Sequence, residues 1–187
     1  MLIEKDKSGL IIIDVQEKLV SAMPKPHKFI DNIIKLQKAA GILNVPVIFS
    51  EQYPKGLGKT INKIKEIAYK QIELGVEKED WPRREKTAFA IPLTSLTQIT
   101  EISEQIIICG IEAHVCVLQT AINLATEKKV YVVQDAISSR YEKDYLTALS
   151  RLDKHPNIQI LTCEMVLFEW LRTSDQPEFK TSSQLIK

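Results

Sequence analysis

The chain has 187 residues, of which 44% are hydrophobic and 26% are charged, and its formal net charge is +1. This length suffices for one domain with a sizeable core. We expect a single domain over residues 1–187, with its core at about 9–171 and a peripheral tail at 173–187. Balanced charge gives no electrostatic reason to expect nucleic acid or an anionic membrane as the main partner.

The apolar runs are the size of strands. The longest, Gly9–Ile13 and Ile106–Ile111, are far shorter than a membrane span. The first residues become charged at once, which is not the pattern of a secretory signal. Three widely spaced cysteines form neither a disulfide framework nor a metal-binding pattern, and we expect a cytoplasmic location.

Short apolar runs alternate with helical patterns along the chain. We predict strands at Leu10–Ile13, Val45–Phe49, Ile106–Cys109, Val130–Val133 and Ile158–Thr162. We predict helices at Phe29–Leu43, Val115–Lys128, Lys143–Lys154 and Met165–Arg172, the last of which is terminal and amphipathic. Continuous apolar strands bounded by helices are typical of a parallel sheet that is covered on both faces. The predicted fold is therefore α/β, a three-layer, doubly wound, Rossmann-like sheet of about six mainly parallel strands with helices on both faces. Function is expected at the carboxyl ends of the strands.

The segment from Gln52 to Lys86 has no clear periodicity, and a long excursion of this kind more often covers a site than merely connects elements. Within it, Gly56–Thr60 is similar to a phosphate-binding loop. The glycine required five positions before Gly58 is replaced by Tyr53, however. We therefore interpret this run as a flexible turn over the pocket.

Three residues that can carry chemistry stand out. Asp14 closes the first predicted strand, Cys116 lies a few residues past the strand that ends at Cys109, and Lys86 ends a charged tract. Each has an ordinary interpretation, as a turn carboxylate, a small buried hydrophobe or a solvated lysine. Together they supply a thiol nucleophile, a proton acceptor and a stabilising cation. A helix beginning near Cys116 could lower its thiol pKa to about 3.5–7.5.

The motifs around these residues resemble those of the isochorismatase-like cysteine hydrolases, a family that includes nicotinamidases and carbamoyl-amide hydrolases. The resemblance extends over nearly the whole chain and is carried by Leu10–Gln16, Lys86–Phe89 and Cys109–Val117. Two further runs, Ser50–Gly58 and Asp135–Arg140, are similar to the isochorismatase-domain-containing branch.

This resemblance implies a catalytic triad of Asp14, Lys86 and Cys116. It also implies an oxyanion hole formed by the backbone N–H groups of Glu112 and Cys116, with a cis peptide bond between Ile111 and Glu112. It further suggests more than one subunit, hence a homo-oligomer.

Two departures from the family narrow the chemistry. Nicotinamidases hold a metal with an Asp-x-His motif after the second strand, where this chain reads Phe49-Ser50-Glu51-Gln52-Tyr53. The histidines, His27, His114 and His155, lie in unrelated segments, so we expect no metal and no cofactor. His114 and Cys116 would face different ways on a helix, which favours a structural role for His114. The members of the family that cleave vinyl ethers lack a cysteine at the position of Cys116. Its presence here favours acyl chemistry at an amide, a carbamoyl group or a related unit.

The sequence thus predicts hydrolysis of a small amide, carbamoyl or related C–N substrate through a thioester on Cys116. Tyr53, Trp81 and Phe89 are candidate pocket walls, with core packing as the alternative. Two other classes stay open. One is a scaffold that turns nothing over, and the other is a redox sensor at Cys116, without an obvious resolving partner. Of the remaining thiols, we expect Cys109 to be shielded and Cys163 to be ordinary.

Overall fold

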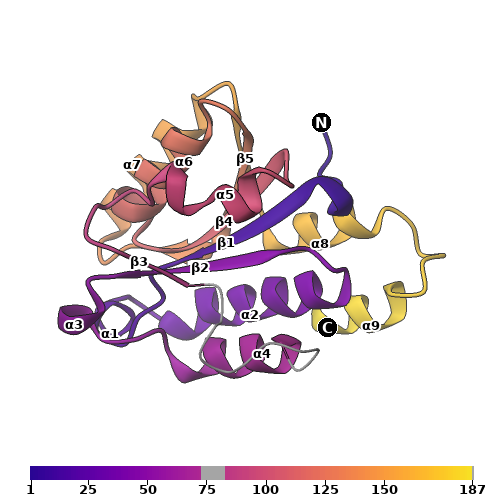
Figure 1. The fold of residues 1–187 in the computed structure, drawn as a ribbon, viewed down its shortest axis with the longest axis horizontal. Coiled ribbons are helices and arrows are strands. Elements are labelled where there is room, and N and C mark those ends of the chain that lie inside the picture. The colour runs from indigo at the N-terminus through magenta and orange to yellow at the C-terminus, as the bar shows by residue number, and fades with distance from the viewer. Residues whose placement is uncertain (73–82, 187) are drawn as a thin grey trace.

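The structure is a computed structural model that describes residues 1–72 and 83–186. Its centre is a six-stranded parallel sheet with the order β3-β2-β1-β4-β5-β6 (Figure 1). The strands are β1 (Ser8–Ile13), β2 (Val47–Gln52), β3 (Arg83–Lys86), β4 (Gln105–Ile111), β5 (Lys129–Ser138) and β6 (Ile158–Leu161). The predicted doubly wound α/β fold is confirmed, and the sheet is entirely parallel rather than mainly so.

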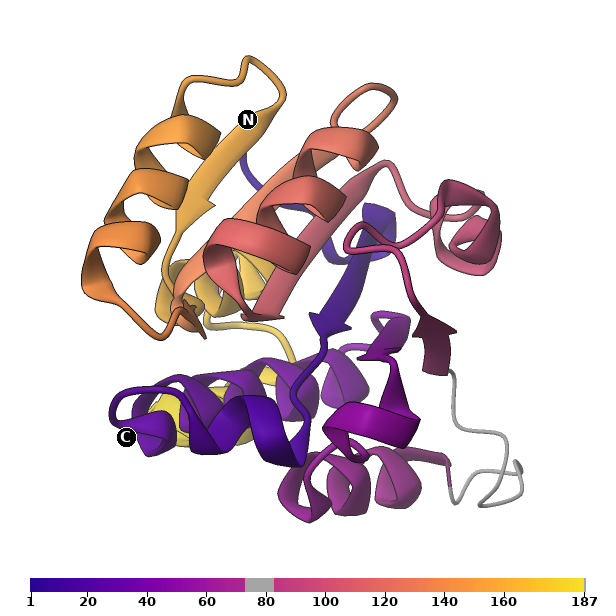
Figure 2. The same ribbon diagram turned by 90° about the vertical axis from the view of Figure 1, so that its left-hand side faces the viewer.

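Helices cover both faces of the sheet (Figure 2). One layer contains α2 (Pro26–Ile42), α4 (Asn62–Ile72) and α8 (Cys163–Leu171), and the other contains α5 (Thr97–Thr100), α6 (Leu118–Leu124) and α7 (Glu142–Asp153). Shorter helical segments are η1 (Lys5–Lys7), α1 (Glu17–Ser21), α3 (Pro54–Leu57), η2 (Leu93–Ser95), η3 (Ala113–Val117), α9 (Phe179–Ser183) and η4 (Gln184–Ile186).

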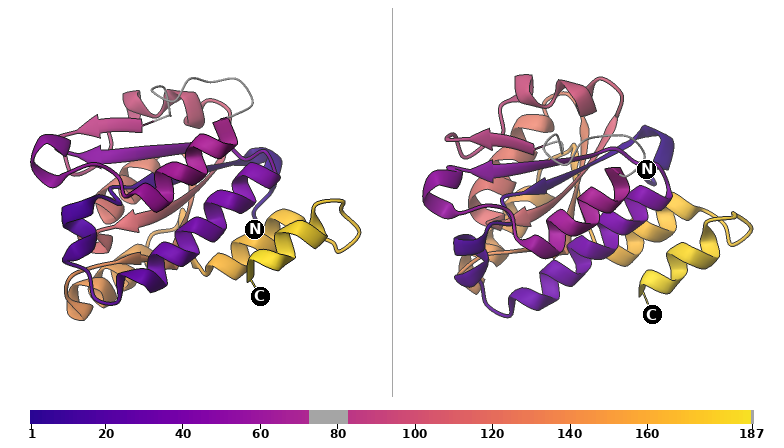
Figure 3. Two further views of the ribbon diagram at one scale, coloured as in Figure 1. Left: turned by 90° about the horizontal axis from the view of Figure 1, so that it is seen from below. Right: turned by 60° about the horizontal axis from the view of Figure 1, so that its bottom comes forward.

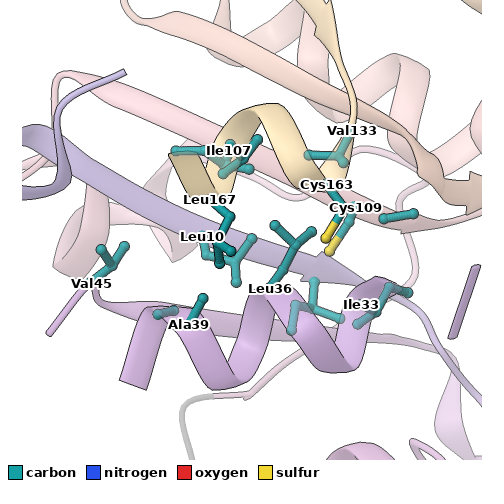
Figure 4. Packing of buried hydrophobic residues seen from close by; sticks show 14 of the residues in the cluster. Leu10, Ile33, Leu36, Ala39, Val45, Ile107, Cys109, Val133, Cys163 and Leu167 are labelled. Atoms are coloured by element: carbon teal, nitrogen blue, oxygen red, sulfur yellow. The ribbon is translucent and has the colours of Figure 1, made fainter. Parts of the chain in front are cut away.

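Strand side chains divide between the two layers by alternation. In β1, Leu10 and Ile12 belong to the core under α2, α4 and α8, whereas Ile11 and Ile13 belong to the core under α5, α6 and α7. Successive side chains of a strand point to opposite faces, so a strand buried on both faces is apolar over most of its length. Figure 4 shows the first core, in which Leu167 of α8 and side chains of α2 gather around Leu10.

The segment that was predicted to be irregular contains regular structure at both ends. Helix α4 occupies Asn62–Ile72, and Arg83–Lys86 forms the edge strand β3. The sequence did not reveal β3, because its residues are all charged and an edge strand does not need a continuous apolar run. The residues between them, which include Trp81, lie outside the described part of the chain.

The tail at 173–187, predicted to be peripheral, makes contacts with one of the two cores. Phe179 of α9 and Leu185 and Ile186 of η4 pack against the cluster under α2 and α8, and Ser182 is fully buried. Figure 3 shows this last helical segment beside α8 and α2. The tail therefore covers part of one helical layer.

Gly110 lies inside β4, which continues to Ile111 and does not end at Cys109 as the sequence predicted. Its φ is +118°, and a Cβ atom there would lie 2.1 Å from the carbonyl oxygen of Ile13. Only glycine adopts such a backbone conformation freely. The backbones of β1 and β4 therefore approach closely at Ile13, the residue before Asp14.

Gly110→Ala should lower the free energy of unfolding by roughly 2–4 kcal/mol, from an unfavourable φ and an overpacked backbone contact. Urea denaturation measures this loss. Gly41→Ala, on the exposed surface of α2, is the matched control, and it should stabilise by up to about 1 kcal/mol. Equal stability of Gly110→Ala and the unmodified protein would contradict the close approach.

Candidate active site

The strand order brings the three candidate catalytic residues to one edge of the sheet. Strands β1 and β4 are central neighbours at the point where the strand order reverses, which is where open α/β sheets bind ligands. Asp14 directly follows β1, Cys116 comes shortly after β4, and Lys86 is the last residue of β3. All three therefore lie at the carboxyl edge.

The register of β2 supplies two residues that sequence reasoning missed. Ile13 pairs with Ser50, and Gln52 pairs with Lys86, so Ser50 and Gln52 lie on the same face beside Asp14 and Lys86. The Ser50 hydroxyl donates a hydrogen bond to Asp14 Oδ1 at 2.6 Å. No motif reveals these roles, since they depend on which residues face each other across neighbouring strands.

The Lys86 ammonium lies at the centre of the site. Its Nζ donates to Asp14 Oδ2 at 2.7 Å, to Gln52 Oε1 at 2.6 Å and to the Phe89 carbonyl at 3.1 Å. The Cys116 Sγ atom is 3.5 Å from the same nitrogen. The Lys86 and Asp14 side chains are only 2% and 0% exposed. The structure therefore brings a buried ion pair into contact with the thiol.

Asp14 reaches this cluster because its backbone leaves the strand conformation. Alternation after Leu10 and Ile12 would direct residue 14 toward the α2 layer, whereas its partners Ser50 and Lys86 lie on the other face. Asp14 has φ +51°, a left-handed conformation that aspartate tolerates better than most residues. The local backbone thus turns the carboxylate toward Lys86.

Gln16 fastens the segments around the site. Its Oε1 accepts from the Gln52 amide at 2.7 Å, and its Nε2 donates to the carbonyls of Gln52 at 3.0 Å and Gly58 at 2.6 Å. Nearby, the buried Glu51 accepts from the Thr60 amide and hydroxyl, both at 2.7 Å. The Gly56–Thr60 run is therefore held by specific hydrogen bonds at Gly58 and Thr60, and its flexibility stays a prediction.

The backbone before Cys116 has an unusual shape. The bond between Ile111 and Glu112 is cis, as expected. A π-helical turn follows, in which the amides of Val115 and Val117 donate to the Glu112 carbonyl at 3.1 and 3.2 Å. Whether the Glu112 and Cys116 amides act together as an oxyanion hole stays a prediction.

The side chain of Glu112 fixes this segment to the chain after β5. Its Oε2 accepts from the backbone amide and the Nε of Arg140, at 3.0 and 3.2 Å. The carboxylate is mostly buried, whereas Arg140 is exposed. The start of the segment leading to the thiol is therefore held both by β4 and, through the Glu112 side chain, by Arg140.

The direction of the Cys116 pKa differs from the prediction. The pKa of this thiol is raised to about 12, first by burial and then by the charge of Asp14, while the ammonium of Lys86 acts to lower it. The helix-terminus prediction is wrong because loss of hydration outweighs the favourable charges. Cys116 also lies in the π-helical turn, ahead of α6 rather than in its first turn. The resting side chain is therefore a neutral thiol.

The two other cysteines lie on the opposite face of the sheet. Cys109 and Cys163 belong to the core under α2 and α8, where they are neighbours (Figure 4), whereas Cys116 belongs to the other core. Cys109 is fully buried, as predicted. Burial raises the pKa of Cys163 to about 12, so it is not the ordinary thiol that was expected.

A pocket of about 490 Å³ adjoins the cluster, lined by Tyr53, Pro54, Lys55, Glu85, Lys86, Thr87, Ala88 and Pro92. Tyr53 and Phe89 are each 54% exposed, so the alternative that they pack in the core is wrong. Phe89 contacts the site through its carbonyl group. Trp81, the third candidate wall, lies outside the described residues.

His114 makes contacts that agree with a structural role. Its Nδ1 hydrogen-bonds with Ser139 Oγ at 2.9 Å, and its Nε2 lies 3.9 Å from Asp144 Oδ2. Over residues 1–72 and 83–186, no cluster of three or more His, Cys, Asp or Glu side chains could hold a metal ion. Among the described helices, none has the length and apolar character to cross a membrane.

A doubly wound parallel sheet with Asp, Lys and Cys side chains meeting at its switch point defines an isochorismatase-like α/β protein. Residues 8–164 match the model of the isochorismatase domain, and the chain belongs to that family.

Several known proteins are similar over most of their length. Isochorismatase domain-containing protein 2 of Danio rerio is 35% identical, over 96% of this chain and 86% of its own. The solved MAR1 ribonuclease of Caenorhabditis elegans is also 35% identical, with a TM-score of 0.89 over 100% of this chain and 92% of that one. The Escherichia coli YcaC product, an octameric hydrolase of unknown specificity, is 21% identical with a TM-score of 0.78 over 100% and 98% of the two chains, and shows the fold alone.

Iodoacetamide should modify Cys116 before Cys163 and Cys109, and its rate should rise about tenfold per pH unit through about pH 9 without levelling off. The reason is that the thiolate fraction of a thiol with a raised pKa keeps growing over this range. Peptide mapping at each pH measures the three rates separately. Faster labelling of another cysteine would remove Cys116 as the candidate nucleophile, and a plateau below about pH 8 would contradict the raised pKa.

Proposed function

We propose that the protein is a cysteine hydrolase that cleaves a small amide, carbamoyl or related C–N substrate through a thioester on Cys116. The observation that carries this proposal is the buried contact of Lys86 Nζ with both Asp14 Oδ2 and Cys116 Sγ, at 2.7 and 3.5 Å. Membership of the isochorismatase family supports a hydrolytic role.

In the first half of the reaction, the Asp14 carboxylate accepts the thiol proton as Cys116 Sγ attacks the substrate carbonyl carbon. The developing oxyanion accepts hydrogen bonds from the backbone amides of Glu112 and Cys116, and one such donor is typically worth about 3–4 kcal/mol. Asp14 then gives its proton to the leaving nitrogen, the C–N bond breaks, and a thioester remains.

In the second half, a water molecule replaces the amine. Asp14 accepts a proton from this water as its oxygen attacks the thioester carbon, and the same oxyanion position is stabilised again. The C–S bond breaks, the acid product leaves, and the proton returns from Asp14 to the sulfur. Throughout, the Lys86 ammonium offsets the negative charge that moves between Asp14 and Cys116.

The remaining features of the proposal follow from the same reasoning. The substrate is a small molecule, no metal or cofactor takes part, and the enzyme acts in the cytoplasm as a homo-oligomer, the kind of state known for YcaC. The Caenorhabditis elegans relative is named a ribonuclease. The near-neutral charge of this chain gives no electrostatic reason to expect RNA as its substrate, because phosphate binding depends on clustered cations.

A library of small amides and ureides should contain compounds that the unmodified protein hydrolyses and that Cys116→Ala does not. Asp14→Asn should reduce turnover by roughly 10³-fold or more with the fold intact, because an amide cannot accept the thiol proton. Cys163→Ala is the matched control and should keep its activity. Intact-mass spectrometry should find one acyl adduct, and peptide mapping should place it on Cys116 alone.

Turnover that survives in Cys116→Ala would exclude the proposed nucleophile. The absence of both turnover and adduct over the whole library would favour the scaffold alternative. An RNA oligonucleotide cleaved by the unmodified protein and by Cys116→Ala alike would indicate a nuclease activity that does not use the proposed thioester route. Peroxide consumption that depends on Cys116 would favour the sensor.

Treatment with a chelator should change neither stability nor activity, because the proposed chemistry needs only protein groups. Thermal melts and turnover before and after dialysis against the chelator measure this. Stoichiometric zinc or iron in the purified protein, lost together with activity, would contradict the proposal.

A further inference from the structure

We infer that Gln52 is a positioning residue that fixes which atoms receive the protons of Lys86, and so sets how readily the Cys116 thiol loses its proton. The consequence for turnover rests on the proposed function. The inference itself concerns the geometry around the ammonium, and it can be tested without a substrate.

The first step is a count of protons. A lysine ammonium has three N–H donors. Three oxygen atoms lie around Lys86 Nζ, at 2.6 Å on Gln52, 2.7 Å on Asp14 and 3.1 Å on Phe89, all near or within the usual hydrogen-bond range. Cys116 Sγ is the fourth and most distant acceptor, at 3.5 Å. Three N–H donors therefore serve four acceptors, so the hydrogen bond from Lys86 to the sulfur competes with those to the three oxygens.

The second step is that Gln52 is held in the orientation that this role requires. Its side-chain Nε2 donates to the Thr87 carbonyl at 2.8 Å, which leaves Oε1 to face the ammonium. Its backbone amide and carbonyl are both bound by Gln16, at 2.7 and 3.0 Å. The acceptor oxygen is thus preorganised from two sides.

The third step is what a change at Gln52 would do. If residue 52 offers no acceptor, one N–H of Lys86 loses its oxygen partner. Asp14 and Phe89 already accept the other two N–H groups, so Cys116 Sγ is the acceptor left to receive the third. A hydrogen bond donated to sulfur favours the thiolate. A carboxylate at the same position would instead draw the ammonium toward itself and add negative charge near the sulfur. The two changes should therefore shift the thiol in opposite directions.

Gln52→Leu and Gln52→Glu provide the matched pair. Both lose the hydrogen bond to the Thr87 carbonyl, so a merely structural role would affect them in the same sense. The readout is the iodoacetamide rate of Cys116 against pH, from peptide mapping, with Cys163 as the internal reference. We expect labelling about tenfold faster than in the unmodified protein for Gln52→Leu, and slower for Gln52→Glu.

Equal rates in all three proteins, or shifts of the same sign in both variants, would overturn the inference. Adding Gln52→Leu to Lys86→Met should leave the rate of Lys86→Met unchanged, because the ammonium through which Gln52 acts is gone. A tenfold effect that persists there would also overturn it. The two Gln52 variants could shift the labelling rate of Cys116 in opposite directions while the protein hydrolyses none of the tested compounds. That result would support the role of Gln52 and would contradict only the proposed hydrolase function.

Discussion

The ion pair between Lys86 and Asp14 is almost completely buried, and the other hydrogen bonds of the site compensate for this burial. Removing two charges from water costs several kcal/mol for each, and their attraction offsets this only where the remaining hydrogen-bonding capacity is also satisfied. Ser50 satisfies the second oxygen of Asp14, and Gln52 and Phe89 satisfy the rest of the ammonium. Losing one partner alone would leave an unpaired buried charge, which typically costs about 3–5 kcal/mol.

The sheet order explains how such a pair can form. Asp14 follows β1 and Lys86 ends β3, and β2 lies between these strands. Residues two apart in β2 point to the same face, so Ser50 reaches toward Asp14 while Gln52 reaches toward Lys86. The four-residue edge strand β3 therefore positions the Lys86 ammonium beside its acceptors, because Lys86 pairs with Gln52 of β2.

The sequence predicts the central strands well, because apolar runs are properties of single segments. The structure brings Asp14, Lys86 and Cys116 together, and their catalytic roles stay a prediction. The sequence does not predict Ser50 and Gln52, since register belongs to a pair of strands. It also misses β3, whose charged residues do not have the pattern of a buried strand. The pKa of Cys116 was predicted in the wrong direction because a helix terminus can be inferred from sequence, whereas the degree of burial cannot.

The raised pKa of Cys116 distinguishes between the functions that the sequence left open. A redox sensor needs an accessible thiolate and a nearby resolving thiol. Cys116 is 5% exposed, it rests as the protonated thiol, and Cys109 and Cys163 lie across the sheet from it. The proposed hydrolase tolerates this state, because Asp14, the carboxylate that disfavours the thiolate at rest, is also the proposed acceptor of its proton. In such a hydrolase, the thiolate forms only as its negative charge passes to the carbonyl oxygen of a bound substrate. The burial that would hinder a redox sensor is therefore compatible with acyl transfer assisted by a base.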